Sequence, residues 1–322
     1  MSSDSTQPSI WKNGQLVPFA EATCHVLCHA LHYGSSVFEG IRLYGTPEGP
    51  RFFRLNDHMQ RMYDSAKIYR MKIPYDLQTL LDATHEVVAT NGLQEGAYIR
   101  PFAFRGMSGL GVAPPEDGPI DVCIAAQKWG AYLGADGLER GVDVCVSSWQ
   151  RVAPNTIPAT AKAAGNYLSS QLITMEAQRL GFVEGIGLTV DGTVSEGAGE
   201  NLFLVRQGRI VTPPTAASIL GGITRDTIIH LAKDLGYEVV EQAIPREMLY
   251  LADELFFTGT AAEVTPIRSV DHIEIGPGHR GPVTKKIQDA FFGLFSGKTA
   301  DTRNWLEPLG EAPTSAAAAA GA

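Results

Sequence analysis

The chain has 322 residues, of which 44% are hydrophobic and 19% charged, and its net charge is −9. This length suits about two domains of roughly 150 residues each. The acidic balance argues against a nucleic acid as partner. No apolar run approaches the roughly 18 residues of a membrane span, and the polar start at Met1–Ile10 differs from a signal peptide. Four cysteines are too few for a disulfide framework, so we expect a cytoplasmic protein.

The first part of the chain alternates strand and helix signals. Hairpins are predicted around Asn13-Gly14 and around the Gly- and Pro-rich stretch Gly45–Pro50. Apolar spacing predicts helices over residues 57–69 and 77–89. Strands are expected over residues 97–104 and 121–126, after which the segment 127–138, rich in Gly and Ala, is expected to connect two domains.

The second part again mixes strands and helices. Strands are predicted over residues 142–147, 184–190, 254–257 and 264–268, and helices over residues 167–180, 224–235 and 283–295. Asp191-Gly192 and Gln207-Gly208 mark hairpin turns. We therefore expect an α/β (α+β) chain, with a small N-terminal α/β domain at 1–126, an interdomain loop at 127–138, a large C-terminal domain at 139–309 and a disordered tail at 310–322.

Three partial motifs carry little weight. Gly293 and Gly297 are separated by three residues, whereas a P-loop needs four. Ala89 stands where a zinc protease motif beginning at His85 needs its second histidine. The segment Cys24–His32 has Cys and His at spacings that can ligate zinc, but a second cysteine pair is missing. We predict no metal and keep a non-catalytic zinc protein as the weakest alternative.

Five other segments carry a stronger signal, and they occur in this order: Leu31–Arg42, Thr160–Tyr167, Val194–Phe203, Leu220–Arg225 and Thr258–Glu263. Together they resemble the fold-type-IV pyridoxal-phosphate enzymes, and within them the branched-chain amino acid aminotransferases. The resemblance extends from about Ile10 to Leu309. It implies two domains with the cofactor cleft between them. It also implies a homo-oligomer, which is at least a dimer and in some bacterial members a hexamer.

The resemblance also assigns cofactor-binding roles. Lys162 matches the catalytic lysine that binds pyridoxal 5'-phosphate as a Schiff base and moves the substrate proton. Glu196 matches the carboxylate that faces the pyridine nitrogen, with Glu200 as a competing candidate on the same loop. The remaining cofactor contacts are Arg61 on the phosphate, Ile223 and Thr224 at a helix start that suits a phosphate, the Thr260 hydroxyl, and Tyr167 beside the phenolic oxygen. Many relatives have proline where this chain has Gly221, so we expect a looser loop there.

Substrate recognition is assigned in the same way. Strand alternation puts Tyr98 and Arg100 on one face. In branched-chain aminotransferases the matching residues recognise carboxylates, and the arginine binds the side-chain carboxylate of glutamate. The resemblance further implies a pocket for leucine, isoleucine or valine lined by Tyr33, Phe38, Gly40 and Trp129, with backbone N–H groups of Thr260 and Ala261 on the α-carboxylate.

The implied activity is a reversible ping-pong transfer of the amino group between L-leucine, L-isoleucine or L-valine and 2-oxoglutarate, as used in branched-chain amino acid biosynthesis. D-amino acid aminotransferases, aminodeoxychorismate lyases and (R)-selective amine transaminases share the lysine and glutamate motifs. Tyr98 and Arg100, together with the loop Gly130–Gly134, favour the branched-chain enzyme. The substrate ranking and a biosynthetic or catabolic role stay open.

Overall fold

A computed structural model describes residues 8–130 and 136–310. Contacts divide the chain into two compact units. The first comprises Met1–Gly130, Lys162–Gly165 and Asp301–Ala322, and the second comprises Ala131–Ala161 and Asn166–Ala300. The expected loop at 127–138 lies partly, and the expected tail at 310–322 almost wholly, outside the described residues. The predicted domain boundaries stay predictions.

The first unit is built on one antiparallel sheet, with the order β17-β5-β4-β6-β7-β1-β2 and with β3 paired to β6. Its strands are β1 (Ser9–Lys12), β2 (Gln15–Pro18), β3 (Ser36–Phe38), β4 (Ile41–Thr46), β5 (Gly49–Phe53), β6 (Ala97–Arg105), β7 (Ile120–Lys128) and β17 (Leu306–Pro308). Its helices are α1 (His29–Tyr33), α2 (Leu55–Ile68) and α3 (Leu77–Thr90), besides the short 3-10 helix η1 (Phe19–Glu21). β7 continues to Lys128, which pairs with Ala97, so the strand extends into the predicted loop.

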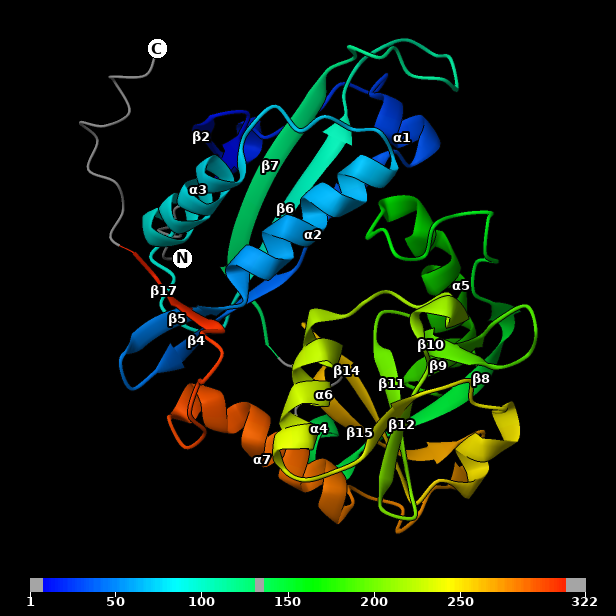
Figure 1. The fold of residues 1–322 in the computed structure, drawn as a ribbon. Helices are drawn as coiled ribbons and strands as arrows, with labels where there is room; N and C mark the ends of the chain where they lie inside the picture. Colours follow the sequence, from blue (N-terminus) through cyan, green and yellow to red (C-terminus); the bar gives the residue numbers. More distant parts are fainter. Residues whose placement is uncertain (1–7, 131–135, 311–322) are drawn as a thin grey trace, which may run out of the picture. The chain divides into compact units, whose positions relative to one another are not determined.

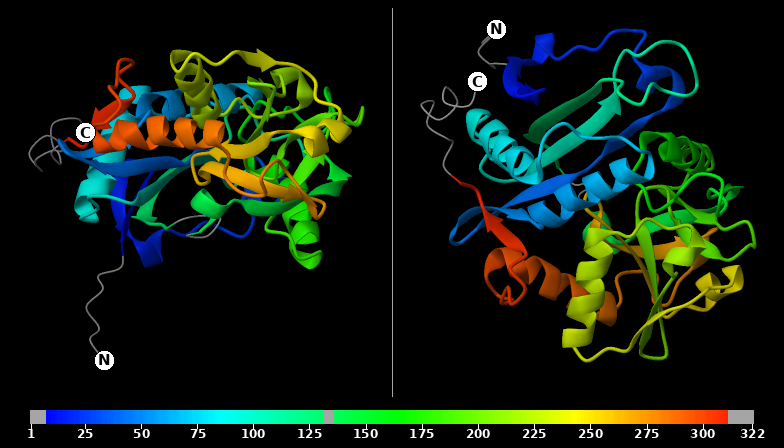
Figure 2. Two further views of the ribbon diagram at one scale, coloured as in Figure 1. Left: turned by 90° about the horizontal axis from the view of Figure 1, so that it is seen from below. Right: turned by 45° about the horizontal axis from the view of Figure 1, so that its top comes forward.

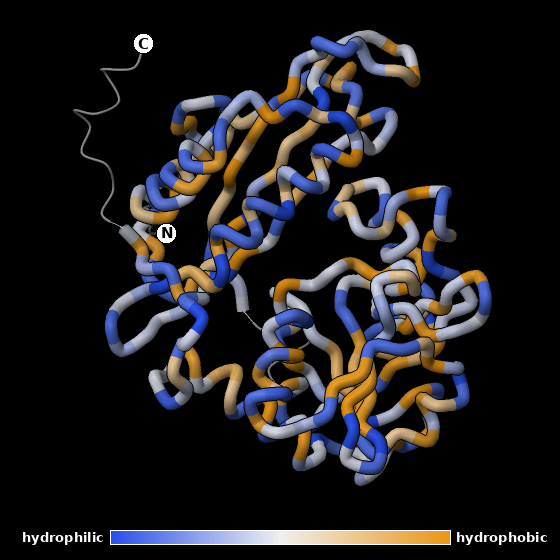
Figure 3. The backbone as a smooth tube through the Cα atoms, viewed as in Figure 1, coloured by the Kyte–Doolittle hydropathy of each residue, from blue (hydrophilic) through white to orange (hydrophobic). Residues whose placement is uncertain are grey.

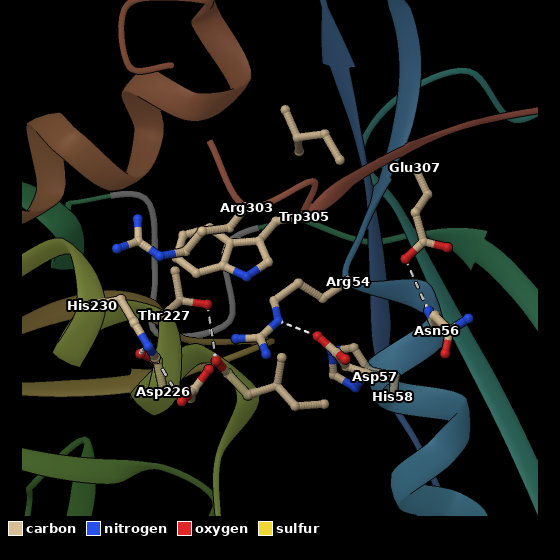
Figure 4. A network of polar contacts seen from close by, with 12 residues as sticks. Arg54, Asn56, Asp57, His58, Asp226, Thr227, His230, Arg303, Trp305 and Glu307 are labelled. Carbon is tan, nitrogen blue, oxygen red and sulfur yellow. Dashed lines mark hydrogen bonds and ion pairs between the residues drawn. The ribbon is translucent and has the colours of Figure 1, made fainter. Parts of the chain in front are cut away.

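Two amphipathic helices cover one face of this sheet (Figure 1). Asp76 caps α3 by accepting a 2.8 Å hydrogen bond from the Thr79 backbone N–H, and the apolar side of α3 packs on β1, β6 and β7. α2 packs against α3 and β3. Its start is tied to the C-terminal strand, since Glu307 of β17 accepts a 3.0 Å hydrogen bond from the Asn56 backbone (Figure 4). β17 itself lies beside β5 (Figure 2).

The second unit is built on a sheet with the order β10-β9-β8-β15-β14-β11-β12-β13, and β16 pairs with β15. Its strands are β8 (Val142–Gln150), β9 (Glu184–Leu188), β10 (Val194–Gly197), β11 (Asn201–Arg206), β12 (Arg209–Thr212), β13 (Val239–Glu241), β14 (Glu254–Gly259), β15 (Glu263–Val270) and β16 (Ile273–Glu274). The pairs β8–β9, β8–β15 and β12–β13 are parallel and the other pairs are antiparallel.

The helices of the second unit are α4 (Gly137–Arg140), α5 (Tyr167–Arg179), α6 (Ile223–Asp234) and α7 (Pro282–Ser296). Shorter 3-10 helices are η3 (Thr215–Ala217), η4 (Arg246–Leu251) and η2 (Ala164–Asn166), of which Ala164 and Gly165 belong to the first unit. α5 packs on β8 and β9, whereas α6 and α7 pack on β14. The strands carry the hydrophobic residues and the outer turns are hydrophilic (Figure 3), and Val144, Leu202 and Phe257 are fully buried in the core.

The expectation of a mixed α/β chain is confirmed. Each predicted helix has a counterpart within two residues of its predicted ends, because each carries a long apolar period. The strands β3 and β16, of three and two residues, were not predicted, because a period of two cannot be recognised over so few positions. Within the described residues, no helix is long and apolar enough to cross a membrane.

Candidate active site

Lys162 is fixed through its backbone in the first unit. Its N–H donates a 3.0 Å hydrogen bond to the Ser65 hydroxyl of α2, and its carbonyl accepts a 3.0 Å hydrogen bond from the Phe38 N–H. The next residue, Ala163, forms a β-bridge with Val37 and is buried. The segment around Lys162 is therefore held against β3 and α2, and the half-buried lysine side chain begins from a fixed position.

The Phe38 ring lies close to two cationic side chains. The Lys162 Nζ lies 4.9 Å from its centroid and the Arg100 guanidinium carbon lies 4.8 Å from it. Both distances are within the range of cation–π attraction. Phe38 pairs with Phe102 of β6, and this pairing places its ring near Arg100 of the same strand. The predicted catalytic lysine and the predicted carboxylate-binding arginine therefore share one aromatic neighbour.

Tyr98 connects Arg100 to two further predicted pocket residues. The Arg100 Nη2 donates a 3.3 Å hydrogen bond to the Tyr98 hydroxyl, and the Trp129 ring lies edge-on to Tyr98 at 4.3 Å between centroids. Gly40 faces the same hydroxyl, since a Cβ added at Gly40 would lie 1.9 Å from it. Glycine is thus required at position 40 by the closeness of Tyr98. The structure brings Phe38, Gly40, Tyr98, Arg100, Trp129 and Lys162 together.

A cavity of about 310 Å³ opens beside these residues in the first unit. Its lining combines Tyr98, Arg100 and Trp129 with the polar Gln127 of β7 and with five small or apolar side chains: Pro8, Ile10, Phe19, Ala125 and Ala126. Such a volume suits a small ligand, and a largely apolar wall with one arginine suits a ligand that is apolar, anionic or both.

Arg61 lies on α2, one turn after His58, and both side chains bind the buried carboxylate of Glu39. Arg61 donates from Nε to Oε1 at 2.7 Å and from Nη2 to Oε2 at 2.8 Å, while the His58 Nδ1 lies 2.7 Å from Oε2. Burial alone would raise the pKa of Glu39, but Arg61 and His58 outweigh it and hold this pKa well below its ordinary range. Burial lowers the pKa of His58, against the opposing effect of Glu39. Glu39 is therefore an ionised carboxylate.

Glu196 is the centre of the polar network in the second unit. It lies on β10 and is buried. The Arg151 Nη2 donates to its Oε1 at 2.7 Å, and its Oε2 accepts 3.0 Å hydrogen bonds from the Asn201 side chain and the Leu220 N–H. Each of these donors is an N–H group, so the network stabilises the ionised carboxylate. Glu200, the competing candidate, is also buried, and its Oε2 accepts from the Gly199 N–H at 3.1 Å.

The loop before α6 is tied to this carboxylate. The Asn201 amide donates to the Leu220 carbonyl at 2.9 Å, and a Cβ added at Gly222 would lie 2.0 Å from the Asn201 Oδ1. Gly222 is the N-cap residue of α6, and a glycine has no side chain with which to cap the helix. The backbone N–H groups of a first turn attract anions. The predicted phosphate residues Ile223 and Thr224 are the first two residues of α6 (Figure 4 shows the next turn, from Asp226 to His230).

The remaining predicted residues are Thr260, Ala261, Tyr167 and Tyr33. Thr260 and Ala261 form the half-buried turn between β14 and β15, beside the buried Thr258, whose hydroxyl has no hydrogen-bond partner in the described part of the chain. Tyr167 begins α5 and is half-buried. Tyr33 is 42% exposed, and its hydroxyl donates a 2.6 Å hydrogen bond to the Leu110 carbonyl.

The Cys24–His32 segment is occupied by local hydrogen bonds. The Cys28 thiol donates to the Arg105 carbonyl at 3.0 Å, His29 contacts the Ser35 hydroxyl at 2.7 Å, and His32 contacts the Val26 carbonyl at 3.1 Å. Over residues 8–130 and 136–310, no group of three or more His, Cys, Asp or Glu side chains is arranged to hold a metal ion.

Four residues of the two polar networks, one network in each unit, were not predicted from sequence: Glu39, His58, Arg151 and Asn201. Two of them carried a weak signal, because Glu39 and Asn201 lie inside the motif segments. His58 and Arg151 carried none, since their partners lie 19 and 45 residues away along the chain.

Comparison with known proteins agrees with this geometry. The family described as class IV amino-transferases matches residues 36–270. The branched-chain-amino-acid aminotransferase of Salmonella typhimurium is 58% identical over 300 residues, which are 93% of this chain and 97% of the relative. The Escherichia coli K12 enzyme of the same name is also 58% identical, over 94% of this chain and 97% of its own length.

Solved structures give the same result. The crystal structure of the Escherichia coli branched-chain amino acid aminotransferase superimposes with a TM-score of 0.93 at 57% identity, covering 94% of this chain and all of that chain. The structure of the branched-chain amino acid aminotransferase from Thermobaculum terrenum in its PLP-form gives a TM-score of 0.87 at 35% identity, covering 95% of this chain and 99% of its own. This chain belongs to the class IV aminotransferases and, within them, to the branched-chain-amino-acid aminotransferases.

Proposed function

We propose that this chain transfers the amino group reversibly between L-leucine, L-isoleucine or L-valine and 2-oxoglutarate, in a ping-pong cycle with pyridoxal 5'-phosphate carried on Lys162. The observation that carries the proposal is the Phe38 ring, which has Lys162 and Arg100 within 4.9 Å of its centroid. An amine that can accept a proton and a guanidinium that can bind a carboxylate therefore adjoin the same apolar surface.

The residues of each unit fit this cofactor. In the second unit, the donors around Glu196 stabilise its ionised form and fix its orientation, which suits a protonated ring nitrogen. The N-terminus of α6, with Gly222 as its N-cap, suits a phosphate, and the buried Thr258 hydroxyl that precedes Gly259–Ala262 has no partner in the described residues. In the first unit, Arg61 offers a guanidinium, whose planar fork matches phosphate oxygens. The Thr260 hydroxyl and Tyr167 are proposed to complete the cofactor contacts.

When bound, pyridoxal phosphate supplies an electron sink for the electron pair left at the substrate α-carbon. The chain supplies the proton transfer and the positioning. Lys162 Nζ would take the proton from the α-carbon and deliver it to the cofactor, and it would move a proton in the opposite direction when the 2-oxo acid receives the amino group. Its backbone bonds to Ser65 and Phe38 keep the amine near its reaction position, so little reorganisation is needed when the proton moves.

The pocket must accept two kinds of side chain in turn. Phe38, Tyr98 and Trp129 offer aromatic surface to a branched apolar side chain. Arg100 offers a charge to the side-chain carboxylate of glutamate, and its 3.3 Å bond to Tyr98 keeps it at the aromatic wall. The same pocket can therefore bind both substrates without rearrangement of its backbone. The backbone N–H groups of Thr260 and Ala261 are proposed to hold the α-carboxylate that both substrates share.

We also propose that the chain acts as a homo-oligomer of at least two copies. Five large apolar side chains of the first unit are exposed near Tyr33: Val26, Leu27, Leu31, Leu110 and Val112. Exposed apolar clusters of this kind mark protein interfaces. Light scattering that gives the mass of a single chain at working concentrations would contradict this.

The absorption spectrum of the purified protein tests the main proposal. A band in the visible or near-ultraviolet that shifts on adding L-leucine is expected. A band that does not shift with L-leucine but shifts with D-alanine or with 1-phenylethylamine would show that the substrates are D-amino acids or amines instead. If no band appears after incubation with pyridoxal phosphate, the protein does not use this cofactor and the proposal is wrong.

Replacing the lysine tests its role directly. Lys162→Ala is expected to lose almost all transaminase activity and the leucine-dependent shift, because it removes the amine that takes the α-proton. Lys67→Ala changes an exposed lysine of α2 and should leave both unchanged. A fully active Lys162→Ala protein would show that the lysine has another role.

A further inference from the structure

We propose that Glu39 is a positioning residue that sets the orientation of the Arg61 guanidinium for the cofactor phosphate. This inference rests on the proposed function, because it takes Arg61 as the arginine that binds this phosphate. Glu39 itself is 0% exposed, and both of its carboxylate oxygens accept hydrogen bonds from Arg61.

The geometry of the pair fixes the guanidinium plane. Two parallel hydrogen bonds join Arg61 Nε to Oε1 and Nη2 to Oε2, at 2.7 and 2.8 Å. A bidentate pair determines both the position and the plane of a guanidinium, whereas a single bond leaves it free to rotate. The guanidinium edge that carries Nη1 is not part of this pair, and its direction is set by the pair.

Glu39 is itself held from two further sides. The His58 Nδ1 lies 2.7 Å from Oε2, and the Gly40 N–H donates to the same oxygen at 3.3 Å. The Glu39 N–H donates to the Pro101 carbonyl of β6 at 2.8 Å. The Glu39 backbone is thus fixed to the sheet and its carboxylate to α2, which also carries Arg61. An arginine on an isolated helix face has several rotamers, and this arrangement selects one of them.

The contribution of the buried Glu39–Arg61 pair to stability does not explain why Glu39 is buried, whereas a role in orienting Arg61 does. A fully buried carboxylate loses hydration, and a buried ion pair often gives little net stability. The negative charge also lies close to the guanidinium that is proposed to attract a phosphate, so charge alone would weaken phosphate binding. Two effects therefore oppose each other. Orientation by Glu39 favours the phosphate, whereas the charge of Glu39 disfavours it.

Binding to the apoprotein separates the two effects. The full chain is freed of cofactor, and dissociation constants are measured for pyridoxal 5'-phosphate and for pyridoxal, which has no phosphate, by tryptophan fluorescence. The ratio of the two constants reports the phosphate contribution. Glu39→Asp keeps the charge and shortens the side chain, while Glu39→Gln keeps the length and removes the charge. Glu48→Gln, at an exposed ion pair with Arg51, is the matched control.

If Glu39 positions Arg61, both Glu39 variants should lower the ratio of the dissociation constant of pyridoxal to that of pyridoxal phosphate by about tenfold or more. The dissociation constant of pyridoxal itself should change little. A purely electrostatic role predicts no change in Glu39→Asp and a higher ratio in Glu39→Gln, and this result would overturn the proposal. If Glu39→Asp does not fold, Glu39→Gln still separates the two roles, because positioning lowers the ratio of dissociation constants and a purely electrostatic role raises it. A general loss of structure would weaken both ligands equally and would also contradict positioning.

Arg61→Lys provides the second arm. A lysine ammonium is a point charge without a plane to orient. In the Arg61→Lys background, Glu39→Asp should change the ratio by less than about twofold. An undiminished effect there would show that Glu39 does not act through Arg61. Failure of the wild-type apoprotein to bind pyridoxal phosphate at all would instead refute the proposed function, and the two failures are therefore distinguishable.

Discussion

Arg151 donates a 2.7 Å hydrogen bond from Nη2 to Oε1 of Glu196, and both side chains are almost wholly buried. Arg151 is itself held by a 3.1 Å hydrogen bond from Nη1 to the Ser170 hydroxyl of α5. A buried carboxylate is stable only while it is paired and hydrogen-bonded. The arginine therefore maintains both the charge and the direction of the carboxylate that is proposed to face the cofactor ring.

Arg151→Leu should reduce kcat by at least about tenfold, because it leaves Glu196 without its counter-charge. Arg151→Lys keeps a charge but not the planar fork, so a smaller loss is expected. The decisive measurement is kcat in a double-mutant cycle with Glu196→Gln. If Arg151 acts through Glu196, Arg151→Leu adds little to Glu196→Gln. Full additivity would show that Arg151 acts elsewhere.

Arg100→Met should separate the two substrate classes. Methionine keeps apolar volume beside Phe38 but cannot pair with a carboxylate. KM for 2-oxoglutarate is expected to rise about tenfold or more, while KM for L-leucine changes little. Steady-state kinetics with each substrate varied in turn measures this. Arg179→Met, at an exposed position, should leave both KM values unchanged. An equal rise for both substrates would point to a general effect on the pocket.

Sequence reasoning located the residues of the pocket better than it explained their arrangement. Strand alternation alone put Tyr98 and Arg100 on one face, and their hydrogen bond confirms that they are neighbours. The position of Phe38 depends instead on the pairing of β3 with β6. β3 spans three residues, so no local pattern could indicate it. The family resemblance pointed to Phe38, Lys162 and Arg100, but only the fold shows that both cations lie beside the Phe38 ring.

The supporting residues were harder to predict for the same reason. Glu39 and Arg61 lie 22 residues apart, and Arg151 and Glu196 lie 45 apart. A charged residue in a sequence carries no mark of burial, and the usual expectation for it is exposure. Only the sheet pairings and the packing of α2 and α5 place these charges beside their partners. Their roles are therefore a property of tertiary structure.

Gly40→Ala should damage the pocket by displacing Tyr98. The added Cβ would lie 1.9 Å from the Tyr98 hydroxyl oxygen and 2.6 Å from its Cζ, and a buried aromatic ring in contact with Trp129 cannot move freely. A cost of about 1–3 kcal/mol is expected for such overpacking, together with a higher KM for both substrates. Melting temperature and KM measure the two effects.

Two comparisons make the Gly40 prediction specific. In the Tyr98→Ala background the clash is gone, so Gly40→Ala should then cost almost nothing. Gly130→Ala is the matched control, because a Cβ at Gly130 meets no atom within 4 Å. An equal cost of Gly40→Ala with and without the tyrosine ring would mean that the glycine is needed for another reason.

Glu184 gives the second unit a pH-dependent stability. It lies on β9, is 1% exposed, and accepts hydrogen bonds at Oε1 from the Gly185 N–H and the Thr174 hydroxyl. Burial raises its pKa from 4.5 to about 7, against the lowering effect of these bonds. Between these two values the folded chain keeps a proton that the unfolded chain releases. The free energy of unfolding therefore falls as pH rises from about 4.5 to about 7.

Glu184→Gln should remove this dependence, because an amide keeps the Oε1 acceptor and never ionises. The expected gain over the wild type at pH 8 is at most about 3 kcal/mol, since one pKa unit corresponds to about 1.4 kcal/mol. Urea unfolding at pH 5 and pH 8 measures it, with exposed Glu247→Gln as control. The variant and the wild type should differ little at pH 5 and most at pH 8. An equal difference in the free energy of unfolding between the variant and the wild type at both pH values would mean that Glu184 is ionised in the folded chain at neutral pH. Its charge would then be balanced by the Gly185 and Thr174 donors.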